Sequence, residues 1–265
     1  SLGWILSEEP FWKKVKPVVS YMKLRATWGL VGNDKPATGG RFLYTPDSFS
    51  SPISNNPNRG GGYAYPFGGI TGNNVNGIIE SAKHNQNVTW EKSLKQNYGV
   101  DIYFLNDRFR TTFDYYYEKR SDILLSAGIY PSILGFTPPV GNAGKVNSWG
   151  YELTTRWQDK IGPDFRYWVG ANLSYNQNEV IERMEAPQEE QYMYLKGHRI
   201  GSRKFYKFYK YYYDGIEADY EKEFGQPFPK HTTGVDNGVL KPGDATYVDM
   251  NGDGVIDSKD SAYGL

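Results

Sequence analysis

Near its C-terminus the chain has the residue types and spacing of a calcium-binding loop. Residues 249–260, DMNGDGVIDSKD, match the pattern in which oxygen ligands recur at fixed positions and a glycine makes the sharp turn. The candidate ligands are side-chain oxygens and one main-chain carbonyl, from Asp249, Asn251, Asp253, Val255, Asp257 and Asp260. The pattern predicts a structural Ca²⁺ site, although the last ligand is Asp rather than Glu and no entering helix is evident. The alternative is an Asx-turn loop that uses the same residues without metal.

Aromatic side chains are a second candidate for chemistry, because the chain contains 23 Tyr, 13 Phe and 7 Trp. Tyrosine offers a flat apolar face with a polar tip, and such a ring can stack on a sugar. The candidate substrate-binding residues are Tyr63, Tyr65, Tyr209 and Tyr211. The alternative is that these rings pack loops together or face a protein partner.

Catalysis has little support in the sequence. The three histidines are far apart and stand in polar surroundings, at His84, His198 and His231. Three acidic residues could share one face of a helix, but such spacing usually marks a solvated face; they are Glu179, Glu182 and Glu185. There is no glycine-rich phosphate loop or nucleophile elbow, and with no Cys there is neither a thiolate metal site nor a Cys nucleophile. We therefore expect no enzymatic activity and no catalytic residue.

Composition narrows the class of protein further. The 30 basic and 30 acidic residues cancel, which removes the usual electrostatic argument for a nucleic-acid partner. No apolar run is long enough for a transmembrane helix. The many aromatic residues and 30 Gly favour strands and turns, so the expected fold is all-β.

The elements that must position these residues are long strands with alternating side chains. We expect antiparallel strands near 18–31, 94–105, 109–121, 149–158 and 165–176. Soluble strands average about 5–6 residues, whereas a strand that crosses a membrane needs about 9–11. In 165–176, Phe165 and Tyr175 flank the aliphatic Val169 and Leu173, as in the aromatic girdles of an outer-membrane β-barrel. The alternative is a soluble β-sandwich with unusually long strands.

The connections between these strands alternate between long and short, like the extracellular loops and periplasmic turns of bacterial barrels. This parity places region 177–265 outside the cell. Within it we interpret 202–213, SRKFYKFYKYYY, as an aromatic hairpin arm rather than a sixth span. So few strands cannot close a barrel in lipid, so we expect a stretch of a longer polypeptide.

Four segments resemble the SusC/RagA family of TonB-linked outer-membrane transporters. They are GWILSEEPFWKK, YMKLRATWGLVGN, RIGSRKFYKFYKYYYDGI and PGDATYVDMNGDGVIDSKD, and Arg199 stands where the family has a Pro. The resemblance implies a large barrel in the bacterial outer membrane, with a plug that is not visible here. It also implies energy from TonB and pairing with a SusD-like surface lipoprotein.

The sequence thus predicts part of the wall and the extracellular loops of a nutrient importer, in contact with outer-membrane lipid. The expected cargo is an oligosaccharide or a peptide, and we expect no nucleic-acid partner. The competing hypothesis is a secreted calcium-binding β-domain that recognises carbohydrate or protein.

Overall fold

The computed structural model describes residues 1–34, 48–50, 64–67, 73–76, 79–82, 85–126, 139–232 and 239–264. The chain divides into two compact units. Unit 1 comprises residues 1–177 and 182–185, and unit 2 comprises residues 178–181 and 186–265.

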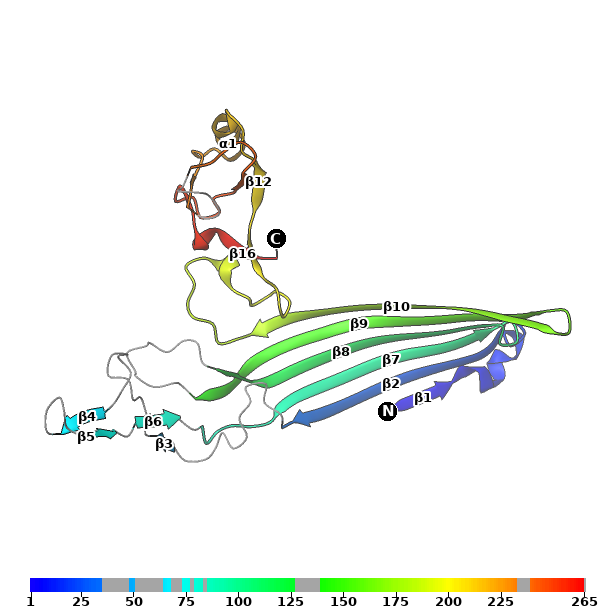
Figure 1. The fold of residues 1–265 in the computed structure, drawn as a ribbon. Coiled ribbons are helices and arrows are strands. Elements are labelled where there is room, and N and C mark those ends of the chain that lie inside the picture. Colours follow the sequence, from blue (N-terminus) through cyan, green and yellow to red (C-terminus); the bar gives the residue numbers. More distant parts are fainter. Residues whose placement is uncertain are drawn as a thin grey trace. The chain divides into compact units, whose positions relative to one another are not determined.

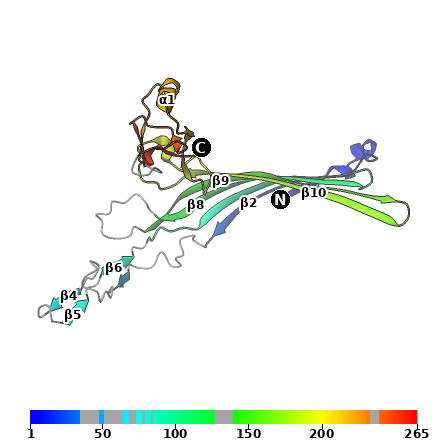
Figure 2. The ribbon, with the colours of Figure 1, turned by 45° about the horizontal axis from the view of Figure 1, so that its top comes forward.

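Unit 1 is built on one six-stranded sheet, in the order β1-β2-β7-β8-β9-β10. Its strands are β1 (Leu2–Ile5), β2 (Val19–Asn33), β7 (Glu91–Phe104), β8 (Phe109–Ser126), β9 (Val140–Ile161) and β10 (Phe165–Glu182). The five long strands lie side by side (Figures 1 and 2). Successive strands from β1 to β9 pair antiparallel, which confirms the all-β expectation.

The expected strands are all present, but several are longer than their sequence patterns. The strand expected at 149–158 runs from Val140 to Ile161, and the one expected at 165–176 continues to Glu182. Alternation marks only the part of a strand that carries an apolar face, whereas the ladder continues into polar sequence. Glu179 and Glu182 therefore lie on a strand, and the helical face considered for them is wrong.

Strand β1 is absent from the expectations because its four residues are too few to show a period. It pairs Leu2 with Ala26 and Ile5 with Lys23 on β2. The 3-10 helices η1 (Leu6–Glu8) and η2 (Pro10–Lys14) then lead into β2.

Two short turns lie at one end of the sheet, here called the turn end. Residues 105–108 join β7 to β8, and residues 162–164 join β9 to β10. The first turn holds Asn106 and Asp107 at φ 55 and 68, and the second holds Gly162 at φ 68. Ser20 Oγ donates a hydrogen bond to Asp107 Oδ1 at 2.8 Å, which fixes the first turn against the start of β2.

The long connections leave from the opposite end of the sheet, as the antiparallel order requires. Within the first of them, β3 (Ser48–Ser50) pairs with β6 (Ile79–Ala82), and β4 (Ala64–Phe67) pairs with β5 (Asn73–Asn76). Of the helices in the described part of the chain, none has the length and apolar character needed to cross a membrane.

Unit 2 is held together by short strand pairs from distant parts of the sequence. β11 (Lys204–Tyr206) pairs with β16 (Ser261–Tyr263), and β12 (Phe208–Tyr211) pairs with β14 (Ala245–Tyr247). β13 (Lys230–His231) runs parallel to β15 (Val255–Ile256). The hairpin arm expected at 202–213 is therefore wrong, because its two strands pair with C-terminal segments and not with each other.

The core of unit 2 forms around helix α1 (Ile216–Phe224), which begins and ends beside left-handed glycines. Tyr220 on this helix is 0% exposed. Its ring centroid lies 4.6 Å from that of Phe224 and 5.2 Å from that of Tyr209. The Tyr220 hydroxyl also accepts a hydrogen bond from the main-chain N–H of Asp249 at 3.0 Å, so the helix supports the loop that follows β14.

Candidate functional site

The sheet of unit 1 has one apolar and one polar face, as strand alternation requires. On the apolar face, Leu24, Val100, Phe113 and Leu153 stand in register across β2, β7, β8 and β9. Large apolar side chains on this face are strongly exposed, including Leu173 at 56%. A contiguous exposed apolar surface of this kind marks contact with another apolar phase or molecule.

Aromatic rings border this apolar face at both ends. Toward the long connections, Trp28 Nε1 donates to the Tyr98 hydroxyl at 3.1 Å, and Tyr151 stacks on Tyr175 at 5.3 Å. At the turn end, the Phe109 ring lies between those of Phe104 and Trp157, at 5.8 and 6.3 Å. Aromatic rings that flank an aliphatic band are typical of a strand wall in a membrane.

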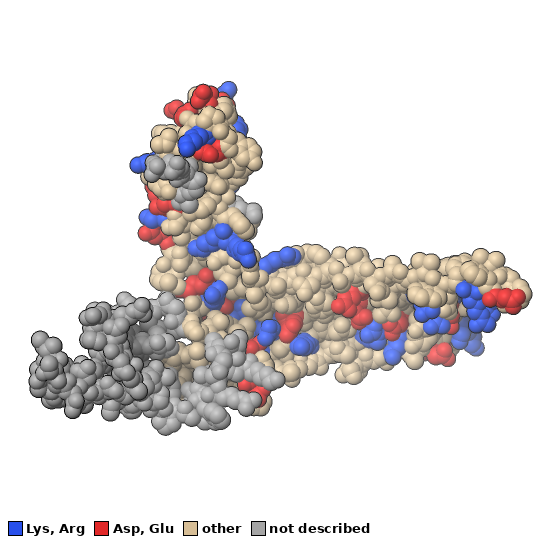
Figure 3. Space-filling view, viewed as in Figure 1, with Lys and Arg blue, Asp and Glu red and all other residues tan. Residues whose placement is uncertain are grey.

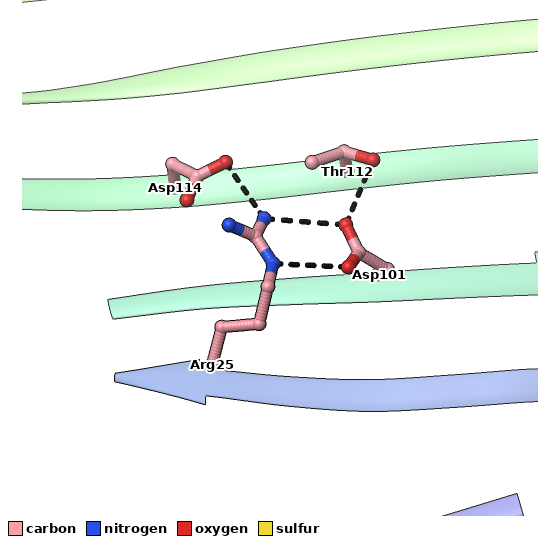
Figure 4. Close-up of polar contacts among 4 residues, drawn as sticks. All are labelled: Arg25, Asp101, Thr112 and Asp114. Carbon is pink, nitrogen blue, oxygen red and sulfur yellow. Dashed lines mark hydrogen bonds and ion pairs between the residues drawn. The ribbon is translucent and has the colours of Figure 1, made fainter. Parts of the chain in front are cut away.

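The polar face carries a half-buried ionic network centred on Arg25 (Figure 4). Arg25 donates from Nε and Nη2 to the two Asp101 carboxylate oxygens, at 2.9 and 3.2 Å, and from Nη2 to Asp114 Oδ2 at 3.0 Å. Thr112 Oγ1 donates to Asp101 Oδ1 at 3.1 Å. The network therefore joins strands β2, β7 and β8 through bonds to charged groups, which are stronger than neutral ones.

Gly99 provides the space for this network. A Cβ atom at Gly99 would lie 2.5 Å from Asp114 Oδ1 and 2.7 Å from Arg25 Cζ. Any side chain there would displace the ion pair. Strand alternation places Gly99 on the polar face, but nothing in the local sequence indicates that side chains from two other strands converge above it.

Other ion pairs cluster toward the long connections. Lys92 Nζ lies 2.9 Å from Asp122 Oδ2, and Lys145 Nζ lies 2.5 Å from Glu182 Oε2. The Arg120 guanidinium pairs with the Glu91 carboxylate. Basic and acidic side chains are interspersed on the face seen in Figure 3.

Strand alternation assigns eight charged side chains to the polar face and predicts that they pair across the wall. This is confirmed for Arg25, Asp101 and Asp114. Arg110 instead approaches Asp107, its neighbour in sequence, at 3.8 Å. The remaining four form no ion pair with any described residue, and they are Lys23, Glu152, Arg156 and Arg166.

The structure separates the tyrosines that were candidates for substrate contact. Tyr209 packs in the core against Tyr220 and Phe224, with its hydroxyl 3.3 Å from Glu223. Tyr211 is 66% exposed and touches the ring of Phe208. Substrate contact by either tyrosine stays a prediction.

The other two candidate tyrosines lie where the structure describes no side chains. Tyr65 is on the backbone of β4, and Tyr63 lies outside the described residues.

The loop at 249–260 is held by side-chain bonds to its own backbone. The Asp249 carboxylate accepts the N–H groups of Gly252 and Gly254 at 2.6 and 2.7 Å. The fully buried Asp260 accepts those of Met250 at 2.8 Å and Asp257 at 2.9 Å. These are the hydrogen bonds of Asx turns and a capping box.

The remaining predicted ligands make local bonds as well. Asn251 accepts from the N–H of Asp253, which in turn accepts from the N–H of Val255. Over the described residues, no three acidic or histidine side chains come close enough together to hold a metal ion. The arrangement therefore does not present the carboxylates to a common cation, and calcium binding by this loop stays a prediction.

Among the side chains of unit 2 with shifted pKa values, Tyr192 and His231 are tied to the short strands and the loop at 249–260. Burial, followed by the charges of Glu190 and Asp260, raises the pKa of Tyr192 to about 12. The Tyr192 hydroxyl donates to the carbonyl of Lys259 at 2.9 Å, so it fastens the end of the loop.

His231 is buried, and its hydrogen bonds are those of a neutral imidazole ring. Its Nδ1 donates to the carbonyl of Pro229 at 3.1 Å, and its Nε2 accepts the N–H of Tyr247 at 3.0 Å. Burial lowers the pKa of His231. Its role is structural; His198 lies beside the ring of Tyr263, and His84 lies outside the described residues.

Comparison with known proteins relates this two-faced sheet to a family. Residues 22–265 match the model of the TonB dependent receptor-like β-barrel. The TonB-dependent receptor P39 of Formosa agariphila is 28% identical over 97% of this chain and 25% of its own length. The TonB-dependent receptor SusC of Bacteroides thetaiotaomicron is 29% identical over 98% of this chain and 23% of its own length.

A solved structure supports the same fold. The RagAB peptide importer in its closed-closed state superposes with a TM-score of 0.63 and 15% identity, over 98% of this chain and 25% of that chain. The chain thus spans about a quarter of the length of the proteins it matches. None of these relatives supports the alternative of a secreted calcium-binding domain.

Proposed function

Because the chain belongs to the TonB dependent receptor-like β-barrel family, we propose that it forms part of the wall of an importer in the bacterial outer membrane. The proposed cargo is a nutrient such as an oligosaccharide or a peptide. The likeness in fold to the RagAB peptide importer supports a peptide as one such cargo.

The two-faced sheet is the observation that carries the proposal. Strands β2 and β8 have 15 and 18 residues, more than the roughly 9–11 that cross the hydrocarbon region. Their apolar face is exposed and bordered by aromatic rings, and their polar face carries charged networks such as that of Arg25. A barrel wall needs this combination, because one face meets lipid and the other lines the lumen.

The partners follow from the family and are part of the proposal. TonB would supply energy through parts of the protein beyond this chain, and a SusD-like surface lipoprotein would cover the barrel from outside. In the proposed orientation the turn end faces the periplasm, and the long connections and unit 2 face the medium. Lipid contacts the apolar face of β2 and β7–β10.

Growth of the host bacterium tests the proposal. The gene for the full-length protein is deleted, and the mutant is grown on a panel of single oligosaccharides and peptides. We expect loss of growth on at least one source, rescue by the intact gene, and no rescue in a strain without TonB. Unchanged growth on every source, with the protein found free in the culture medium, would contradict the proposal.

A further inference from the structure

A pocket of about 490 Å³ lies on unit 1 at the turn end, between the ends of β9 and β10 and the turn before β8. Its lining includes four basic side chains, from Arg108, Arg156, Lys160 and Arg166. Trp168 and Gln158 also line it, and Asp159 is the one carboxylate among the lining residues. We call this site the turn-end pocket.

The strand register adds a fifth basic group beside the pocket. Arg110 on β8 stands directly opposite Arg156 on β9. Like charges in directly opposed positions destabilise a sheet. The Arg156 guanidinium lies over Trp168 at 5.0 Å, and that of Arg110 lies over Tyr103 at 5.0 Å. These aromatic faces orient the two guanidinium groups without neutralising them, and Arg110 also approaches the carboxylate of Asp107 at 3.8 Å.

The one carboxylate among the lining residues, Asp159, already forms an ion pair. Arg108 pairs with Asp159, and the Arg108 guanidinium also lies over the Trp157 ring at 5.4 Å. Among the residues that the structure describes, no carboxylate forms an ion pair with Arg156, Lys160 or Arg166. At the opposite end of the sheet, by contrast, Lys92, Arg120 and Lys145 each have an acidic partner. Three basic side chains without an acidic partner in the described part of the chain therefore gather in the pocket.

We propose that the turn-end pocket binds an oxyanion, either a carboxylate or a phosphate group. Guanidinium groups match the geometry of both, and an anion beside Arg156 would reduce its repulsion with Arg110. Arg156 and Arg166 share the polar face, so the ligand comes from the lumen and not from the lipid. The oxyanion belongs either to a solute in the lumen or to an acidic side chain of the same protein inside the barrel.

The inference rests on the proposed function only in taking the polar face as the lumen. It is tested by binding and melting, without transport, so that its failure is distinguishable from failure of the import proposal. The full-length protein is purified in detergent and titrated with inorganic phosphate at constant ionic strength. The variants are Arg156→Gln and Arg166→Gln, so that one can replace the other if folding fails. The matched control is Arg183→Gln, which removes the same charge from an exposed residue just beyond the far end of β10.

For a solute site, we expect phosphate to bind the wild type and Arg183→Gln equally, and the pocket variants about tenfold more weakly or worse. Without phosphate, Arg156→Gln should melt at a higher temperature than the wild type, because one of two opposed charges is gone. For a site filled by the protein's own acidic side chain, the wild type should not bind phosphate, and Arg156→Gln should melt lower than Arg183→Gln. Equal phosphate binding by all variants would overturn the proposal. So would absent binding together with an Arg156→Gln melting temperature that is not lowered.

Discussion

The Arg25 network makes Gly99 a sensitive position, and Gly99→Ala tests this directly. The added methyl group would meet Asp114 Oδ1 at 2.5 Å and Arg25 Cζ at 2.7 Å. Both atoms are at the ends of flexible side chains, so they would move apart and lose the bond between Arg25 and Asp114. Asp114 Oδ1 already lacks a hydrogen-bond donor, so this loss would leave the whole carboxylate poorly compensated. We expect a loss of about 1–3 kcal/mol in the free energy of unfolding.

Two other glycines of the sheet calibrate the measurement. A Cβ at Gly29 would have nothing within 4 Å, so Gly29→Ala should be neutral or gain up to about 0.5–1 kcal/mol. A Cβ at Gly150 would overlap the main-chain carbonyl oxygen of Tyr175, which cannot move aside as a side chain can. Gly150→Ala should therefore cost more than Gly99→Ala. Guanidinium unfolding of the full-length protein in lipid vesicles gives all three values. Equal stabilities for Gly99→Ala and Gly29→Ala would refute the role of the network.

Three further predictions concern unit 2 and the orientation of the strands. Because its folded pKa lies below its unfolded value, neutral His231 should stabilise unit 2 fully above about pH 6.5 and progressively less below it. A protection factor of the Tyr247 amide against hydrogen exchange that does not change with pH would contradict this. If the 249–260 loop binds calcium, its Kd should be about 10⁻⁴–10⁻³ M and Asp249→Asn should abolish binding; identical calorimetric titrations of both proteins would show that it does not. A tag after Pro139 should be labelled on intact cells and a tag after Gly162 should not, and labelling at Gly162 would reverse the orientation.

Much of unit 1 could be predicted from the sequence, because strand alternation is a local signal. The period of two assigns each side chain to a face, so it predicts that charges such as Arg25, Asp101 and Asp114 share the polar face, but not which of them pair. The signal ended where the apolar band ended, so β9 was expected nine residues too late, at 149 instead of Val140. Strand β1 is too short to show any period.

Unit 2 shows what local patterns leave out. The run at 202–213 alternates well enough to indicate strands, but its partners are distant in sequence. They lie 34–39 residues away at Ala245–Tyr247 and 55–59 residues away at Ser261–Tyr263. Helix α1 has no side-chain cap and only nine residues, so its stability depends on packing Tyr220 into an aromatic core. The role of Gly99 likewise depends on neighbours from two other strands.

The central claim is that this sheet is a membrane wall with one lipid face and one lumenal face. Leu173 and Asn172 are adjacent on β10 and point to opposite faces, so arginine substitutions at the two positions test it most directly. Folding of the full-length protein into lipid vesicles should lose about 2–4 kcal/mol with Leu173→Arg and much less with Asn172→Arg. Equal losses for the two variants, or a larger loss for Asn172→Arg, would contradict the assignment of the faces and with it the barrel wall.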